Sequence, residues 1–190
     1  ATYEGALASA PSEQPRVRIR ALAGVGQVYA VHGMFRRARP LCEEAVEQAR
    51  AAGVRDVESH ALNTLGLALA ALGRADEAIE AIDEALAIAL ELDLPDDIGR
   101  AYANRTNVLA WAGYPDRATH LATEAMASVV DRGVRDHETM LRYIIVGTAF
   151  ECGVWDVAAA QLAEADRMAN PVEWSSLRRA ESALRYLACS

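Results

Sequence analysis

The stretch GRADEAIEAIDEALAIA, residues 73–89, has three counterparts in the same chain, each displaced by a multiple of 40 residues. They are GMFRRARPLCEEAVEQA at 33–49, GYPDRATHLATEAMASV at 113–129 and GVWDVAAAQLAEADRMA at 153–169. All four begin with glycine, and alanine follows five and twelve residues later. Self-similarity at one fixed period of roughly 20 to 50 residues indicates an array of stacked structural units.

Each unit reads as a pair of helices. In VESHALNTLGLALAAL, residues 57–72, leucines recur every three or four positions and form one apolar helical face. Gly73 follows, where a helix end favours a left-handed residue. Aspartates stand where helices are expected to begin, and we expect them to cap the orphan N–H groups there. Asp56, Asp96 and Asp136 stand at the starts of first helices, and Asp76 stands at the start of a second helix. Pro115 marks another helix start, because proline is tolerated there.

Composition narrows the classes of function. The 190 residues are 52% hydrophobic and carry a net charge of −8, which argues against a nucleic-acid-binding module despite the basic stretch RVRIR at 16–20. No apolar run approaches the roughly 20 residues that span a bilayer, and we expect no leader sequence, because no basic segment followed by an apolar core opens the chain. Cys42, Cys152 and Cys189 form no disulfide framework, so we expect a reducing, cytoplasmic location.

Several potential catalytic or ligand-binding patterns fail on inspection. Gly24 and Gly26 lie inside an expected helix rather than in a nucleotide-binding loop. His137-Glu138 lacks the second histidine of a zinc protease, because Leu141 occupies that position. His32 is expected to serve a helix end, His120 to be solvated, and Cys42 to lie in the core. We therefore expect no enzyme activity, no cofactor and no metal.

The pattern Leu62-x2-Leu65-Gly66-x2-Leu69, continued by Gly73, Ala78, Ile82 and Ala85, resembles the tetratricopeptide repeat (TPR) signature. The first unit matches it well, and the third and fourth match it less well. The 40-residue period resembles the long-repeat variants of large ATP-binding LuxR-type transcription regulators and of kinesin light chains. The resemblance implies an all-α fold, a right-handed α-solenoid of stacked antiparallel helix pairs.

The columns of the repeat set the expected organisation. A single TPR-like array fills 1–190, with full units at about 16–52, 56–92, 96–132 and 136–169. The segments 1–10 and 172–190 read as half units, which suggests that the chain is a piece of a longer array. An apolar face left at such an end would promote self-association of the fragment.

The resemblance also implies a binding site, because first helices line the concave face of a TPR array. Three columns are expected there: Arg20, His60, Arg100, Met140; Ala23, Asn63, Ala103, Tyr143; and Gln27, Leu67, Asn107, Gly147. With Asn104 and Trp111, the expected partner-binding residues are Arg20, Gln27, His60, Asn63, Arg100, Asn104, Asn107, Trp111, Met140 and Tyr143. The carboxylate clamp of chaperone-binding members does not carry over, since most of its positive charge is missing.

Two interpretations of these side chains compete. Trp111, Met140 and Phe150 are expected to pack between repeats more often than to contact a partner. The arginine and asparagine side chains are expected to be simply solvated slightly more often than to bind.

Three functions fit the sequence. The first is a non-catalytic module that binds a peptide, a protein segment or another domain of its own chain, within a larger bacterial signalling or transcription regulator. The second is a small-effector sensor array that gates an attached ATPase or DNA-binding domain. The third is a structural spacer or self-association element. None requires a membrane or direct contact with nucleic acid.

Overall fold

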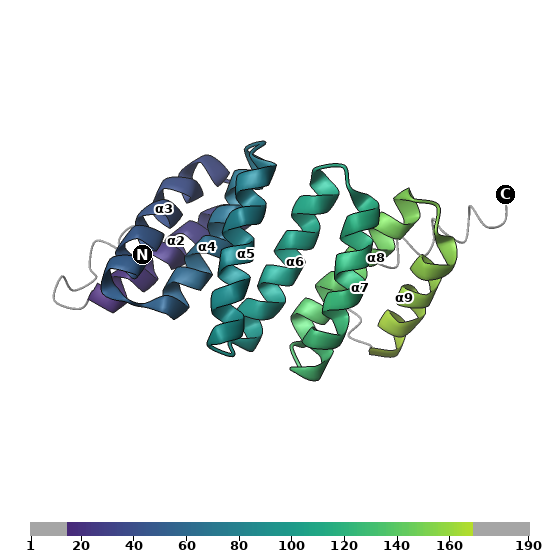
Figure 1. Cartoon of the computed structure of the whole chain (residues 1–190). Helices are drawn as coiled ribbons and strands as arrows, with labels where there is room; N and C mark the ends of the chain where they lie inside the picture. Colours follow the sequence, from purple (N-terminus) through teal and green to yellow (C-terminus); the bar gives the residue numbers. More distant parts are fainter. Residues whose placement is uncertain (1–14, 169–190) are drawn as a thin grey trace.

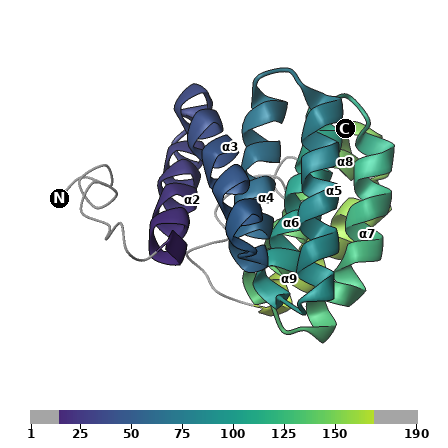
Figure 2. The same cartoon turned by 60° about the vertical axis from the view of Figure 1, so that its left-hand side comes forward.

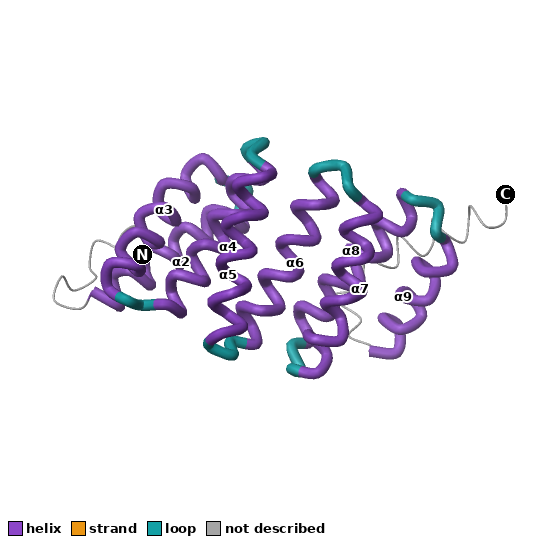
Figure 3. The backbone as a smooth tube through the Cα atoms, viewed as in Figure 1, coloured by secondary structure: helices purple, strands orange, loops and turns teal. Residues whose placement is uncertain are grey.

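The computed structural model describes residues 15–168, which form eight helices in antiparallel pairs and contain no strand (Figure 3). The expected half units at 1–10 and 172–190 lie outside the described residues. The pairs are listed here in chain order: α2 (Pro15–Val31) with α3 (Phe35–Ala52), α4 (Arg55–Ala71) with α5 (Ala75–Glu91), α6 (Pro95–Trp111) with α7 (Pro115–Asp131), and α8 (Arg135–Glu151) with α9 (Trp155–Met168).

The recurring glycines end the first helix of each pair. Gly33, Gly73, Gly113 and Gly153 all have positive φ, between 72° and 83°, a backbone conformation that side chains with a Cβ rarely adopt. The turns between pairs follow the same rule at Gly53 and Gly133. The turn between α5 and α6 differs, because Asp93 occupies the equivalent place with φ of 48°.

The aspartate caps expected from the sequence are wrong. The residues that precede α4, α5, α6 and α8 are Val54, Arg74, Leu94 and Val134, and no side chain there bonds a helix N–H. Asp56, Asp76 and Asp96 lie inside the first helical turn, where a negative charge still suits the helix dipole. Main-chain hydrogen bonds, and not side-chain caps, form the helix ends. One example is the bond from Ala78 N–H to the Arg74 carbonyl, at 3.0 Å.

Small residues set the approach of the two helices within a pair. A Cβ added to Gly66 would lie 2.8 Å from the Ala78 carbonyl oxygen and would collide with the Ile82 side chain. In the first pair, a Cβ on Gly26 would lie 2.6 Å from Cys42 Sγ. The predicted contact between Gly66 and Ala78, and the predicted core position of Cys42, are confirmed.

The helices form two layers, with α3, α5 and α7 in front of α2, α4, α6 and α8 (Figures 1 and 2). Each first helix contacts the next first helix: α2 with α4, α4 with α6, and α6 with α8. Among the described helices, the backbones of α3 and α5 do not approach closely, nor do those of α5 and α7, although the Arg50 side chain of α3 pairs with Glu84 of α5 at 2.6 Å. The first helices therefore pack more closely together and form the inner layer of a curved array, while the second helices spread apart outside it.

Three junctions join the four pairs, and they are numbered here in chain order. The first junction, between α2–α3 and α4–α5, lies within one large apolar cluster that includes Leu22, Val57 and Leu62. A second cluster, with Leu141 and Ile145, occupies α6, α7 and α8 around the third junction. At the second junction, between α4–α5 and α6–α7, the first cluster reaches α6 in the described chain only through Ala101 and Val108.

Candidate functional site

A cleft of about 300 Å³ opens between three helices of the inner layer. Its walls come from three successive pairs, because α2, α4 and the start of α6 all contribute. The lining combines charged or polar groups with a few apolar ones; its members are Arg20, Gly24, Gln27, Asp56, Val57, His60, Leu94 and Asp97. Three of the expected binding residues, Arg20, Gln27 and His60, therefore meet at one place.

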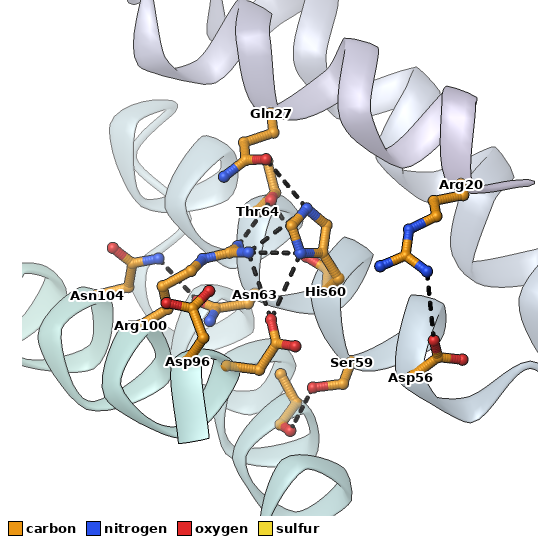
Figure 4. Close-up of polar contacts among 12 residues, drawn as sticks. Arg20, Gln27, Asp56, Ser59, His60, Asn63, Thr64, Asp96, Arg100 and Asn104 are labelled. Carbon is orange, nitrogen blue, oxygen red and sulfur yellow. Dashed lines mark hydrogen bonds and ion pairs between the residues drawn. The ribbon is translucent and has the colours of Figure 1, made fainter. Parts of the chain in front are cut away.

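Two sets of charged groups face this cleft. On one side, the Arg20 side chain is 71% exposed and lies 3.8 Å from Asp56, which forms its closer ion pair with Arg16 at 2.7 Å. On the other side, Arg100 is only 12% exposed and lies beside His60 and Thr64 (Figure 4). Its Nη1 also lies 3.4 Å from Asp97 Oδ1. Arg20 is thus free to reorient toward a ligand, whereas Arg100 is fixed.

His60 connects the two neighbouring inner helices through both ring nitrogens. Its Nε2 lies 3.1 Å from Gln27 Oε1, and its Nδ1 lies 2.5 Å from Arg100 Nη1. A guanidinium has only donors, so Nδ1 accepts from Arg100 in the neutral ring and the proton resides on Nε2. Asp97 Oδ1 lies 3.4 Å from the same Nδ1.

Burial and charge act in opposite directions on the two ionised groups of α6. Burial alone raises the pKa of the Asp97 carboxyl, but contact with His60 and the charge of Arg100 outweigh it, so this pKa lies below its ordinary value. Burial lowers the pKa of the Arg100 guanidinium, and Asp97 opposes that change. Both groups are charged at neutral pH, and each compensates the other.

An amide pair continues the polar contacts deeper between α4 and α6. Asn104 Nδ2 donates to Asn63 Oδ1 at 2.7 Å, and the Asn63 side chain is fully buried. Asn63 Nδ2 finds no hydrogen-bond acceptor among the described residues. Asn107, one turn further along α6, is partly exposed and lies beyond this pair.

The inner layer changes character toward α8. Trp111 is 58% exposed, Tyr143 50% and Met140 44%. The expectation that Trp111 and Met140 fill the space between repeats is wrong, because shorter residues such as Val108 and Ile145 fill it instead. Phe150 does pack, in an edge-to-face contact with Trp155 at 5.3 Å between ring centroids.

The structure also corrects two expectations about the polar set. Arg100 and Asn63 are not simply solvated, because neighbouring helices enclose both side chains. Ala23 and Ala103, expected on the open concave face, are buried with Asn63 between inner helices. An α-helix turns 100° per residue, so Ala23 points about 60° away from Arg20, three residues earlier. The column that contains Ala23 and Ala103 therefore faces the next helix, whereas the column of Arg20 faces the open side.

Asp56, Asp97 and Thr64 belong to the cleft or its polar surroundings but were missing from the expected binding set. Asp97 had a usable signal, since it precedes Arg100 by three residues and the two share a helix face. Because aspartates near helix starts were interpreted as caps, the pairing of Asp97 with Arg100 was not predicted. No sequence pattern predicts Leu94, which lines the cleft from a connecting turn.

The remaining candidates play structural parts. His32 Nδ1 lies 2.7 Å from the Val28 carbonyl at the end of α2, as expected, and His120 is 77% exposed. Burial raises the pKa of the Cys42 thiol to about 12, which makes it a poor nucleophile. No group of three His, Cys, Asp or Glu in the described residues could hold a metal ion. None of the described helices is both long and apolar enough to cross a bilayer.

Comparison with known proteins extends these observations. The family model described as tetratricopeptide repeat matches residues 17–91. BtubC (BKLC) from P. vanneervenii superposes with a TM-score of 0.69 at 18% identity, over 87% of this chain and 69% of that chain. Among curated protein sequences, none matches the chain.

Two further solved structures hold nearly identical TPR-like repeats from Podosopora anserina, described as kinesin light chain. The first, a form with one substituted residue, has a TM-score of 0.66 at 16% identity and covers 93% of this chain and 85% of that chain. The second has a TM-score of 0.62 at 17% identity and covers 85% of this chain and 81% of that chain. Identities this low carry the fold alone.

TPR proteins are generally non-catalytic scaffolds that bind proteins or peptides. The all-α solenoid, its glycine turns and its small packing residues agree with the matched family model. Residues 17–91 match the tetratricopeptide repeat family model, and the other described helices continue the same all-α solenoid.

Proposed function

We propose that this array binds an extended peptide or protein segment along its inner layer. The cleft between α2, α4 and α6 is the main support, because it gathers polar groups from three successive pairs. Exposed Trp111, Met140 and Tyr143 offer apolar contact area further along the same layer. Aromatic side chains of this kind are frequent anchors in protein interfaces.

Each part of this surface has a chemical task in the proposal. The Arg20 guanidinium offers donors to a carboxylate or carbonyl of the partner, and the amide of Gln27 offers a further donor. Trp111 and Tyr143 cover apolar side chains of the partner. Arg100 holds His60 and Asp97 in place and makes no contact with the partner. Because the helices are already formed, binding does not require the array to fold.

A random peptide display library tests the proposal. The array should enrich peptides whose binding weakens by roughly tenfold for each of Arg20→Ala, Trp111→Ala and Tyr143→Ala, as measured by fluorescence anisotropy. Val130→Ala is the matched control, because Val130 is 45% exposed on α7 in the outer layer. The proposal fails if no peptide is enriched, or if all three inner-layer variants bind the enriched peptides as tightly as the control does.

A small effector is the second candidate for the same cleft. A volume of about 300 Å³ lies at the lower end of the range for small-molecule sites, and the polar groups converge there. An effector would bind the cleft without using Trp111 or Tyr143. Ligands found by thermal shift that lose affinity in Arg20→Ala but not in Tyr143→Ala would favour this function over peptide binding.

We further propose, from the 40-residue period, that the array belongs to a larger cytoplasmic bacterial transcription regulator of the LuxR type. There it would connect a signal to an ATP-binding or DNA-binding domain of the same chain. The coding DNA on both sides of this segment decides the matter. An ATP-binding motif upstream and a helix-turn-helix downstream support the proposal, whereas flanking sequence that encodes no further domain contradicts it.

A further inference from the structure

The apolar core of the array is divided along α6, the first helix beyond the second junction. The cluster of the first two pairs reaches α6 only through Ala101 and Val108 in the described chain, and the next cluster begins on α6 with Ala103. Apolar burial stabilises an interface roughly in proportion to the area removed from water. The α6 side chains of the first cluster are one alanine and one valine, which bury less area than the leucine and isoleucine side chains at the neighbouring junctions.

Polar contacts take the place of apolar ones across the second junction. Arg100 reaches His60 and Thr64, the latter at 3.3 Å, and Asn104 bonds Asn63. On the outer side, Arg105 Nη2 donates to Asp83 Oδ2 at 3.2 Å. When the junction opens, these groups can exchange their hydrogen bonds for bonds to water, so each bond adds only a modest net stabilisation of the closed arrangement.

Two local features lower the cost of opening further. Asn63 Nδ2 has no acceptor among the described residues in the closed arrangement, so its desolvation is uncompensated there. The connecting turn of this junction also carries Asp93 at positive φ, where the turns at Gly53 and Gly133 have glycine. Beside this turn Ile98 is fully buried at the start of α6, a place about which the pair could rotate.

We propose that the second junction is a hinge, at which the pair α6–α7 rotates relative to α4–α5, with Arg100 as its latch. The cleft straddles this hinge: α2 and α4 lie on one side, and Leu94 and Asp97 lie on the other. Rotation therefore changes the width of the cleft and the curvature of the array together. The hinge does not depend on the proposed peptide or effector.

Distances between spin labels test the hinge in the intact chain. Glu47, Ala87 and Ala127 are exposed at equivalent positions of α3, α5 and α7. Each can be replaced by cysteine in a background with Cys152→Ser and Cys189→Ser, and buried Cys42 is left in place. The pair 87/127 spans the second junction, and the pair 47/87 spans the first as a matched control.

We expect the distance distribution of 87/127 to be about twice as wide as that of 47/87. Arg100→Met, which keeps most of the side-chain volume but removes the latch, should widen only the 87/127 distribution. Thr64→Val removes one latch contact more gently and serves if Arg100→Met does not fold. Equal widths in the unmodified background would overturn the proposal, as would a latch variant that widens both distributions alike.

Discussion

Equivalent positions of the repeat carry chemically different side chains at the first and second junctions. Val57 is buried at the first junction, and Asp97, its equivalent 40 residues later, faces His60 and Arg100 at the second. The first junction combines leucine-rich apolar packing with polar contacts such as His60 to Gln27, whereas the contacts of Asp97 and Arg100 with His60 make up much of the second. The comparison shows how a repeat array can keep one backbone while varying the rigidity of each interface. Four substitutions would break or sharpen it.

Leu22→Ala should have the largest effect. Leu22 is 1% exposed within the first cluster, so truncation removes apolar contacts and leaves a cavity. We expect the free energy of unfolding in urea to fall by about 3 kcal/mol. Val31→Ala in the same helix is the control, because Val31 is 74% exposed and should change little. Equal losses in the two variants would contradict an apolar first junction.

Asp97→Asn should lower the free energy of unfolding by about 2 kcal/mol at neutral pH, because Arg100 would lose its buried charged partner. The pKa of Asp97 in the folded state lies below its ordinary value. Its stabilisation is therefore complete above that ordinary value, about 4, and is lost as the pH falls through the lower folded pKa.

The pH dependence gives this prediction a second measurement. Native protein and Asp97→Asn should differ most from about pH 5 to 7 and converge in more acidic solution. Asp96→Asn is the control, since Asp96 is 78% exposed and pairs with His137 at 3.0 Å. A difference that persists unchanged at acidic pH would assign the effect to packing instead of charge.

Asp93→Gly should stabilise the array by about 1 kcal/mol, because glycine adopts the positive φ of this turn without steric cost. The mirror variant Gly53→Ala should destabilise by about as much at the first junction. Thermal unfolding of both variants measures the pair. If Asp93→Gly lowers the melting temperature, Asp93 contributes more through its contact with Arg132 than it costs in backbone strain.

Glu58→Ile should have the smallest effect. Glu58 is 3% exposed and bonds Arg50 at 2.8 Å, whereas Ile98 occupies the equivalent place at the second junction. Arg50 is 49% exposed and keeps Glu84, so it is not left buried without a partner. We expect a change within about 1 kcal/mol in chemical denaturation. A loss above about 3 kcal/mol would show that Arg50 depends on Glu58.

The sequence predicted the fold from a few repeated residues. The glycine column indicated the helix ends, because only a residue without a Cβ enters the left-handed region freely. Gly66 and Ala78 indicated the close approach within a pair, because small residues are needed wherever two backbones come together. These signals are local or depend on one neighbour, so a period of 40 makes them visible without coordinates.

The candidate site was predictable only in part. Arg20, Gln27 and His60 were expected on one face, and the structure brings them together at the cleft. Aspartates near helix starts, such as Asp56, were predicted to cap the helices. A sequence shows how near a charge is to a helix start, but it does not show which side chain of a neighbouring helix that charge contacts. Trp111 was in the expected binding set, but packing between repeats was expected more often than partner contact, and the structure leaves it 58% exposed.

The sequence by itself therefore determined the helices, their turns and the order in which the pairs stack, since backbone preference and helical periodicity act over a few residues. Only the tertiary structure decided how apolar and polar contacts divide between the junctions. Side chains 40 positions apart, such as His60 and Arg100, meet through the packing of separate helices. Their burial, their pairing and the cleft they surround depend on the distance between those helices, which no local pattern sets.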